Sequence, residues 1–251
     1  MLSDMRSKRV LVTGSSRGIG RMIAERLAAD GWSVAIHYTS TEKEALSLQK
    51  LLGSACSGVY RADLSDRKKA TPLFEEALAD GPIHAVVNNA GVYMPLDFIN
   101  SGDAAFSANF HKTFAVNFDA PVAIIRAASK HFVTIGGGKI LNVASRVGFR
   151  GEGGAALYAA SKAALINLTR SLAVELAPKN IQLFGIAPGW VDTAMVREGM
   201  RDRFAEIKDT IPLGRMATPK DCAATAAFLL SDDAAYLSGV VIDINGASYF
   251  H

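Results

Sequence analysis

Short runs of β-branched and apolar residues alternate with longer amphipathic stretches along this chain. The short runs are typical of strands buried on both faces of a sheet, and the longer stretches are typical of helices. We expect strands at residues 10–12, 33–37, 57–61, 83–88, 139–143, 181–186 and 240–244. We expect helices at residues 20–29, 42–52, 67–79, 103–132 and 157–177. Strands joined through helices predict a doubly wound, parallel α/β sheet of about seven strands with helices on both faces.

No repeat or low-complexity tract interrupts this alternation, so we expect a single domain over residues 1–251. Residues 192–219 are long for a connection between a strand and a helix. Apolar residues are spread among their charges, which fits either one surface helix with a buried face or a mobile lid over a substrate. Both interpretations stay open.

Composition narrows the class of protein. Of the 251 residues, 49% are hydrophobic and the formal net charge is +3, which indicates a globular chain without the basic stripe of a nucleic-acid binder. The segment before Val10 lacks the apolar centre of a signal peptide, and no apolar run reaches membrane-spanning length. We therefore expect a cytoplasmic protein with neither membrane nor nucleic acid as its partner.

Cysteine and histidine usage gives no sign of a metal site. Cys56 and Cys222 lack C-x-x-C spacing, and the five histidines show no H-E-x-x-H spacing. We expect two thiols in a reducing compartment, with a redox pair as the alternative, and no bound metal.

A glycine-rich turn follows the first predicted strand. Residues 13–20 read T-G-S-S-R-G-I-G and lead directly into a predicted helix. Glycines permit a tight turn and close approach of the backbone to a pyrophosphate, which then meets the N–H groups at the helix N-terminus. The position after the first strand favours dinucleotide binding over the alternative, a plain turn between strand and helix.

Tyr158 and Lys162 lie four residues apart on one predicted helix and therefore share a face. An ammonium group about 5 Å away would favour the phenolate by roughly 3 kcal/mol, or about two pKa units. We therefore expect the lysine to lower the tyrosine pKa toward a useful range for acid/base catalysis. The alternative is an exposed helical pair.

In order and rough spacing, the glycine turn, the N-N-A-G sequence at residues 88–91 and Tyr158-x-x-x-Lys162 resemble the short-chain dehydrogenase/reductase family. The resemblance spans nearly the whole chain, and in its length and ending the chain is most similar to 3-oxoacyl-(acyl-carrier-protein) reductases of fatty acid biosynthesis. It implies a Rossmann-type fold and an oxidoreductase that transfers a hydride between NADP(H) and a small carbonyl or alcohol, with a substrate linked to acyl carrier protein as one option.

The resemblance also implies catalytic roles. Tyr158 would be the acid/base, and Ser145, thirteen residues earlier at a strand end, would hold the substrate oxygen. Lys162 would lower the Tyr158 pKa and bind the nicotinamide ribose. Asn117 would kink the long helix and hold a water that relays protons to the lysine. The alternatives are a loop-capping hydroxyl for Ser145 and a buried packing residue for Asn117.

Cofactor contacts follow from the same resemblance. The implied contact residues are Gly14, Ser16, Arg17, Gly18, Ile19, Gly20, Thr39, Asp63, Leu64, Asn89, Ala90, Gly91, Tyr158, Lys162, Pro188, Gly189, Val191 and Thr193. No acidic residue lies between Val34 and Glu42, where NAD-selective sites hold the ribose hydroxyls. With Arg17 and Thr39 at positions that bind NADPH in the family, we expect NADP(H). Asp63 is alternatively a turn residue before a helix capped by Ser65, and Asn89 is as much structural as functional.

The chain departs from the family beside the catalytic serine, where Arg146, Gly148, Phe149 and Arg150 replace more neutral residues. An arginine there would meet an acidic substrate, but we favour a surface position for both arginines. By analogy with the family, a partly apolar pocket is expected. Its expected lining residues are Tyr93, Met94, Phe149 and Trp190.

The helix at 157–177 is apolar on almost every side, which predicts burial on two sides. One side would cover the sheet, and the other would meet either a second subunit or a neighbouring helix. The resemblance implies a homotetramer, with the apolar C-terminal end as a second contact region.

Two rival functions remain. One is an NAD(P)-dependent alcohol or sugar dehydrogenase that works oxidatively. The other is a non-catalytic protein that senses NADP(H), because a fold alone does not prove catalysis. The complete set of Asn117, Ser145, Tyr158 and Lys162 argues against a sensor, which has no need of an acid/base.

Overall fold

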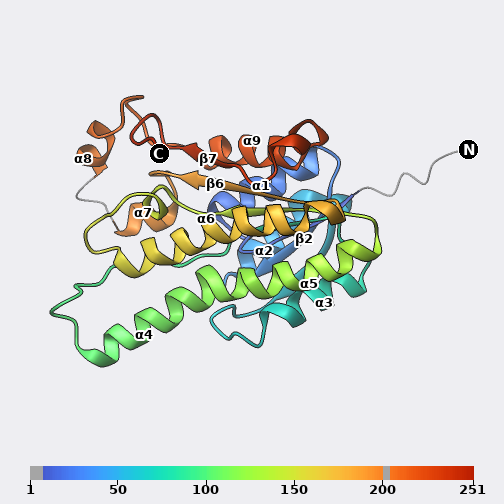
Figure 1. The fold of residues 1–251 in the computed structure, drawn as a ribbon, viewed down its shortest axis with the longest axis horizontal. Helices are drawn as coiled ribbons and strands as arrows, with labels where there is room; N and C mark the ends of the chain where they lie inside the picture. Colours follow the sequence, from blue (N-terminus) through green and yellow to red (C-terminus); the bar gives the residue numbers. More distant parts are fainter. Residues whose placement is uncertain (1–7, 200–203) are drawn as a thin grey trace, which may run out of the picture.

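The computed structural model describes residues 8–199 and 204–251, and its centre is one parallel sheet (Figure 1). The strands are β1 (Arg9–Val12), β2 (Ser33–Tyr38), β3 (Cys56–Arg61), β4 (Ala85–Asn88), β5 (Gly138–Val143), β6 (Ile181–Pro188) and β7 (Val241–Ile244). Their order across the 7-stranded sheet is β3-β2-β1-β4-β5-β6-β7. All neighbouring strands pair in parallel. The predicted parallel sheet of about seven strands is confirmed.

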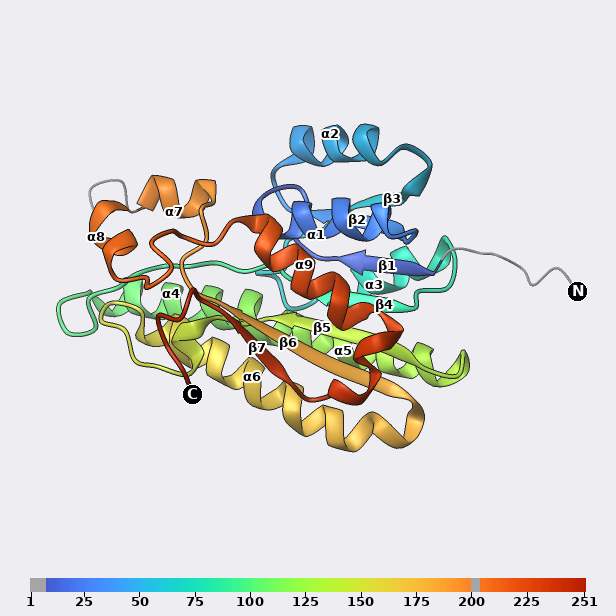
Figure 2. The same cartoon turned by 90° about the horizontal axis from the view of Figure 1, so that it is seen from above.

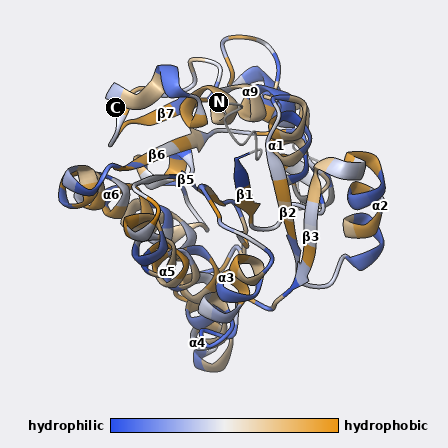
Figure 3. Ribbon diagram, turned by 90° about the vertical axis from the view of Figure 1, so that its right-hand side faces the viewer, coloured by the Kyte–Doolittle hydropathy of each residue, from blue (hydrophilic) through white to orange (hydrophobic). Residues whose placement is uncertain are grey.

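Helices cover both faces of this sheet (Figure 3). The helices are α1 (Gly18–Ala29), α2 (Glu42–Leu52), α3 (Ala70–Ala79), α4 (Asp103–Phe114), α5 (Ala120–Thr134), α6 (Ala156–Leu176), α7 (Ala194–Gly199), α8 (Phe204–Asp209) and α9 (Pro219–Leu230). One buried apolar cluster joins α1, α2 and α9 to one face, and a second joins α3, α5 and α6 to the other. This two-sided burial explains why the strands read as unbroken apolar runs.

The sheet topology places a crevice beside the glycine turn. The chain runs outward from β1 to β3 on one side and from β4 to β7 on the other, so the winding direction reverses between β1 and β4. In open α/β sheets, ligands bind at this reversal, outside the carboxyl ends of the strands. The glycine turn follows β1 and the N-N-A-G turn begins at the end of β4, so both lie at the crevice.

The helical region predicted over residues 103–132 contains a π-helical turn. A π-helical turn at Ala115–Asp119 separates α4 from α5, and Asn117 is fully buried within it. The Asn117 amide bonds the backbone of Val92 on a neighbouring loop, which helps to explain the local departure from α-helical geometry. The predicted helical region is therefore confirmed, and its π-helical turn lies where the family resemblance implied a kink at Asn117.

The connection at 192–219 includes the short helices α7 and α8, and its residues 200–203 lie outside the described part of the chain. Its apolar residues form a small cluster of their own, in which Ile207, Ile211 and Met216 are buried against Trp190. The cluster anchors the segment beside the carboxyl end of β6. A lid movement over a substrate stays a prediction.

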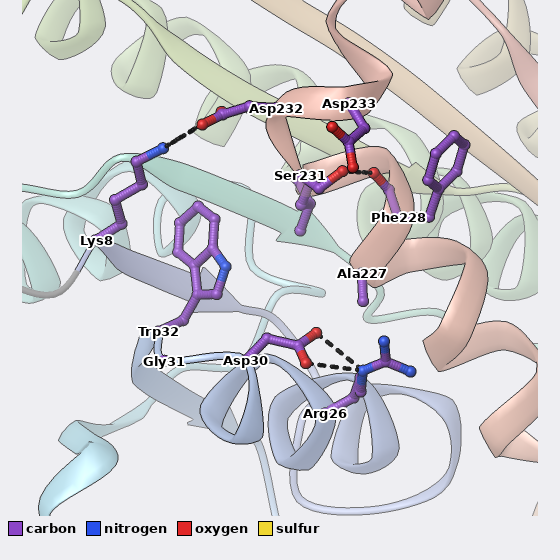
Figure 4. Close-up of a pocket in the computed structure, with 11 residues that line it drawn as sticks. Lys8, Arg26, Asp30, Gly31, Trp32, Ala227, Phe228, Ser231, Asp232 and Asp233 are labelled. Atoms are coloured by element: carbon purple, nitrogen blue, oxygen red, sulfur yellow. Dashed lines mark hydrogen bonds and ion pairs between the residues drawn. The ribbon is translucent and has the colours of Figure 1, made fainter.

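A surface hollow of about 560 Å³ lies at the opposite end of the sheet (Figure 4). It is bordered by Lys8 and Trp32, which precede β1 and β2, and by Phe228 of α9. Ion pairs hold its charges, since Lys8 contacts Asp232 and Arg26 contacts Asp30. It carries none of the residues expected to do chemistry.

Within residues 8–199 and 204–251, no helix has both the length and the apolar character to cross a membrane. The same residues hold no cluster of three or more potential metal ligands. Cys56 and Cys222 are free thiols.

Candidate active site

The glycine turn takes a shape that side chains would prevent. Gly14 and Gly18 have φ angles of +63° and +58°, which non-glycine residues rarely adopt. A Cβ on Gly20 would lie 2.3 Å from Asn89 Nδ2 and 2.4 Å from the Gly14 carbonyl oxygen. The Asn89 amide donates hydrogen bonds to the carbonyls of Thr13 (2.9 Å) and Gly14 (3.1 Å). Asn89 therefore has a structural role, in which it holds the glycine turn against the end of β4.

The turn presents the N-terminus of α1 to the crevice. Arg17 is the N-cap in extended conformation, its side chain makes no capping hydrogen bond, and the first turn of α1 carries no acidic residue. The first backbone N–H groups of a helix have no intrahelical acceptor, and the helix dipole adds positive potential there. This end of α1 fits the pyrophosphate of a dinucleotide.

His37 on β2 joins the glycine turn to the end of β3. Its Nδ1 accepts the N–H of Gly14 (2.9 Å), and its Nε2 lies 3.0 Å from the carbonyl oxygen of Ala62. These partners require a neutral ring that donates from Nε2. Burial lowers the pKa of His37 to about 4, so the ring stays neutral. The sequence reasoning missed this residue, although a histidine in an otherwise apolar strand was a visible signal.

Hydroxyl groups and the Arg61 guanidinium lie where β2 and β3 end. The Ser16 and Thr41 hydroxyl oxygens are 2.6 Å apart, and the Thr39 hydroxyl donates to the Ala62 carbonyl (2.9 Å). Arg61 Nε donates to the Thr39 carbonyl at 3.3 Å. Arg61 was not predicted, and it adds a second positive charge to the region where Arg17 and Thr39 were expected to meet a phosphate.

Acidic side chains near this region are turned to other partners. Glu42 accepts a hydrogen bond from the Tyr38 hydroxyl (3.1 Å). Asp63 Oδ1 accepts from the N–H (3.0 Å) and the hydroxyl (2.7 Å) of Ser65, and these bonds lower the pKa of Asp63. Asp63 is thus a turn residue, and its contact with the cofactor stays a prediction. The cap assigned to Ser65 is wrong, because α3 begins only at Ala70. The Leu64 side chain is buried in the core, which leaves its backbone for any cofactor contact.

Tyr158 and Lys162 meet on the first turns of α6, as their spacing predicted. The Lys162 ammonium lies 5.8 Å from the centre of the Tyr158 ring, and the Tyr93 ring packs edge-on against Tyr158 at 5.1 Å. Lys162 is buried and donates to the Val143 carbonyl at the end of β5 (2.8 Å). The pair is not an exposed helical pair.

The pKa of Tyr158 moves opposite to the expectation. Burial raises the pKa of Tyr158 to about 12, and a hydrogen bond with Ser145 opposes this only in part. The removal of water from around the phenolate is the largest cause of this shift. Burial also lowers the pKa of Lys162 to about 8. The phenol is therefore a protonated acid at neutral pH in the protein alone.

Asn117 and Gly91 complete a buried polar cluster around Lys162. The Asn117 amide accepts the Val92 N–H (2.9 Å) and donates to the Ser161 hydroxyl (3.2 Å), which in turn donates to the Tyr158 carbonyl (2.7 Å). A Cβ on Gly91 would lie 3.4 Å from Asn117 Oδ1 and 3.5 Å from Lys162 Nζ. The N-N-A-G turn, the π-helical turn and α6 therefore converge at one point.

Comparison with known proteins agrees with this geometry. A family model described as enoyl-(acyl carrier protein) reductase matches residues 14–247. The chain is 35% identical to a 3-oxoacyl-[acyl-carrier-protein] reductase of Aquifex aeolicus over 98% of both chains. It is also 35% identical to the enzyme of that name from Escherichia coli, over 98% of this chain and 99% of that one.

Solved structures show the same fold with cofactors bound. A putative NAD(P) dependent gluconate 5-dehydrogenase from Beutenbergia cavernae with bound NADP superposes with a TM-score of 0.88, at 33% identity over 97% of both chains. A 3-ketoacyl-(acyl-carrier-protein) reductase from Brucella melitensis complexed with NADH also gives 0.88, at 30% identity over 97% of this chain and 98% of that one. The chain belongs to the short-chain dehydrogenase/reductase family. It is a nicotinamide-dependent oxidoreductase.

In this short-chain dehydrogenase/reductase, the segment after β6 closes the crevice. A Cβ on Gly18 would lie 3.7 Å from the Thr193 methyl group, so the segment passes beside the glycine turn. Val191 is buried, and its backbone forms an isolated parallel β-bridge with Ala217. A Cβ on Gly189 would lie 2.9 Å from Asn245 Cβ, which explains the small residue there. Pro188 supplies the carbonyl that lies 3.5 Å from the Ser145 hydroxyl.

Ser145 caps the short helical turn Arg146–Gly148, where its hydroxyl also faces the Val147 N–H at 3.4 Å. Both of these backbone contacts are long, and the hydroxyl also forms the hydrogen bond with Tyr158. The next residue corrects an expectation. Arg146 is buried rather than on the surface, because it turns inward to Ser248 and Glu152.

Proposed function

We propose that this enzyme reduces the carbonyl of a 3-oxoacyl thioester or a related small ketone with NADPH, and that Tyr158 is the proton donor. The observation that carries the proposal is the convergence of Tyr158, Lys162 and the Ser145 hydroxyl beside the glycine-lined crevice. The raised pKa of Tyr158 favours reduction, because a phenol that keeps its proton can give it to a developing alkoxide.

Each side chain has a distinct task in this proposal. When bound, NADPH supplies the hydride. Tyr158 donates its proton to the substrate oxygen, which Ser145 orients. Lys162 holds the nicotinamide ribose and offsets negative charge on the phenol oxygen. Asn117 keeps the π-helical turn against Val92 and so places the water path that returns a proton to Lys162.

The cofactor preference rests on the end of β2. Arg61 brings a guanidinium group to this region, Arg17 lies in the glycine turn beside it, and the acid Glu42 is bonded to Tyr38. Guanidinium groups form strong charge-assisted bonds to phosphate, and a free carboxylate would repel it. We therefore propose a preference for NADPH over NADH, with the remaining predicted contact residues as its binding set.

The names of relatives favour the acyl substrate. Those from Aquifex aeolicus and Escherichia coli are 3-oxoacyl-[acyl-carrier-protein] reductases. The oxidative alternative, a dehydrogenase of alcohols or sugars, is favoured by the structural neighbour that is a putative gluconate 5-dehydrogenase. We also propose that the enzyme works in the cytoplasm and that a substrate carried by acyl carrier protein reaches the site past residues 192–219.

The proposed assembly is a homotetramer. The buried residues of α6 lie on one side of the helix, so the second side that was expected to be buried is exposed in the single chain. Val174 on that side is 80% exposed, and Phe110 on the adjoining α4 is 38% exposed. Apolar surface of this kind along two neighbouring helices favours contact with another subunit. Analytical ultracentrifugation, with Val174→Glu as the disrupting variant, tests this assembly.

The test of the function is a screen of NADPH oxidation with acetoacetyl thioesters, quinones, diketones and sugar ketones. Tyr158→Phe should lower kcat by at least about 100-fold, because it removes the transferable proton, while the Kd for NADPH stays within about twofold. Turnover by Tyr158→Phe at a normal rate would refute the acid role. NADPH binding without turnover of any substrate by the unmodified protein would favour the sensor.

A further inference from the structure

Arg146 follows the proposed substrate-binding Ser145 directly, yet its guanidinium points into the protein. The residue is only 5% exposed. Its Nη1 donates to the Ser248 hydroxyl at 2.8 Å, and its Nη2 lies 3.5 Å from a Glu152 carboxylate oxygen. Its Nε is buried and has no hydrogen-bond partner within the described residues. Two partners thus hold a charge that is costly to bury.

Ser248 belongs to the C-terminal segment, residues 245–251, which runs from the end of β7 toward the start of α6 (Figure 2). The segment is folded on itself, since the Ser248 N–H donates to Asn245 Oδ1 (3.1 Å) and Asn245 Nδ2 donates to the Tyr249 carbonyl (2.9 Å). These bonds within the segment fix its local conformation independently of its contacts with other parts of the chain.

The same segment packs against the loop between β5 and α6. The His251 ring stacks on Phe149 with ring centres 3.7 Å apart and planes 11° apart. The Tyr249 hydroxyl donates to the Phe149 carbonyl at 3.4 Å. The Arg146–Ser248 bond therefore belongs to a continuous contact between the chain terminus and this loop.

The second partner of the Arg146 guanidinium, Glu152, lies next to the start of α6. The Glu152 carbonyl accepts the N–H of Ala155 (3.2 Å), the residue just before α6. The negative charge of Glu152 is close enough to Tyr158 to help raise the pKa of that phenol. The Arg146 guanidinium thus connects the loop that carries Ser145 to the C-terminal segment and to Glu152, which precedes α6.

We propose that Arg146 is a positioning residue that fastens the C-terminal segment to the β5–α6 loop and so fixes the Ser145 hydroxyl relative to Tyr158. The inference rests on the proposed function of those two residues. A planar guanidinium suits this task because it donates in two directions at once, whereas a lysine ammonium is a single flexible charge. Besides its hydrogen bond with Tyr158, the Ser145 hydroxyl has two long contacts with backbone groups, so its place beside Tyr158 depends on the loop backbone.

The first experiment compares Arg146→Met with Arg26→Met. The control removes an exposed arginine and its ion pair with Asp30 at the far end of the sheet. For Arg146→Met, kcat should fall about 10- to 100-fold, because a displacement of about 1 Å in a reacting group costs up to that factor. The Kd for NADPH, measured by fluorescence titration, should stay within about twofold. An unchanged kcat in a folded Arg146→Met protein would overturn the proposal.

A pH profile separates positioning from a general loss of packing. The groups that face Tyr158 are Ser145, Tyr93, Lys162 and Glu152. Arg146→Met leaves the charge of Glu152 without its ion pair, so it should move the alkaline limb of kcat/KM for reduction to higher pH. Glu152→Gln removes a negative charge and should move it to lower pH. If the variants only loosened the loop, the alkaline limb of kcat/KM would move in the same direction in both. That result would contradict the proposal.

Milder variants keep the proposal testable if Arg146→Met does not fold. Ser248→Ala should lower kcat about threefold to tenfold, and Arg146→Lys should keep the pH profile while kcat is only partly restored. In a double-mutant cycle, the effects of Ser248→Ala and Arg146→Lys on kcat should be less than additive, because both break one contact. Additive effects would contradict the link. Normal turnover by Tyr158→Phe would instead refute the proposed function itself.

Discussion

The two ends of the crevice differ in how well their buried polar groups are satisfied by hydrogen bonds. At the glycine turn, buried polar groups satisfy one another, since His37 bonds Gly14 and Ala62 while Asn89 bonds Thr13 and Gly14. At the catalytic end, Lys162 has a single backbone acceptor among the hydrogen bonds of the described residues, and burial shifts the pKa of both Lys162 and Tyr158. The first end is a satisfied scaffold, whereas the second keeps ionisable groups in unfavourable surroundings.

This difference teaches where stability and activity reside. A satisfied buried network rigidifies a structure, and its disruption costs folding free energy. Ionisable groups with perturbed pKa values cluster at functional sites, where their charge can respond to a ligand. Substitutions at the two ends should therefore separate the two properties.

The largest expected effect is the loss of activity in Lys162→Met. We expect kcat to fall about 100- to 10,000-fold, because the phenol loses the only ammonium group that faces it among the described residues. The folding free energy should change by no more than about 1 kcal/mol, since relief from burying a charge offsets the lost bond to Val143. Steady-state kinetics and urea unfolding measure both. A large loss of stability would contradict the comparison.

The next effect concerns His37 and pH. Because its folded pKa is about 4 and the unfolded value is 6.5, the unfolded state binds the extra proton first as the pH falls. The stability from the neutral ring is complete above pH 6.5 and is lost toward pH 4, by up to about 3 kcal/mol. Urea unfolding at pH 7 and pH 4.5 should show a steeper loss for the natural protein than for His37→Gln. An equal loss of unfolding free energy between pH 7 and pH 4.5 in both proteins would show that His37 does not titrate in this way.

A smaller loss of stability is expected for Gly20→Ala. The added methyl group would meet Asn89 Nδ2 and the Gly14 carbonyl, so the glycine turn must shift. We expect about 2 kcal/mol of destabilisation and weaker NADPH binding. Gly102→Ala is the matched control, because a Cβ there meets no atom within 4 Å. Thermal melting and cofactor titration should separate the two variants, and equal melting temperatures would refute the packing argument.

The smallest effect sharpens the contrast within the cofactor end. Arg17→Ala and Arg61→Ala should each weaken NADPH binding about tenfold and leave NADH binding within about twofold, because each loses one charge-assisted bond to phosphate. Isothermal titration with both cofactors measures this. Parallel loss of NADH affinity would assign these arginines to the shape of the turn rather than to the phosphate, and comparable kcat/KM with NADH in the natural protein would remove the preference altogether.

Local patterns along the chain were sufficient to predict the architecture. Runs such as residues 10–12 and 83–88 gave the strands of the sheet, although β4 begins two residues later than expected. The four-residue spacing of Tyr158 and Lys162 correctly placed both on one helical face. These features depend on residues near in sequence, so a single chain reveals them.

Longer-range features escaped this reasoning. The burial of Arg146 depends on Ser248, which lies 102 residues away, and the role of His37 depends on Gly14 and Ala62. The direction of the Tyr158 pKa shift was wrong because spacing gives the distance to a cation but not the amount of water excluded.

The sequence by itself determined the order of strands and helices, the glycine turn after β1 and the identity of the groups available for acid/base chemistry. The tertiary structure alone decided which of those groups are buried, what each one bonds and therefore which protonation state each one holds. The physical reason is that periodicity and turn formation are local properties, whereas desolvation and hydrogen-bond partners depend on segments that only folding brings together.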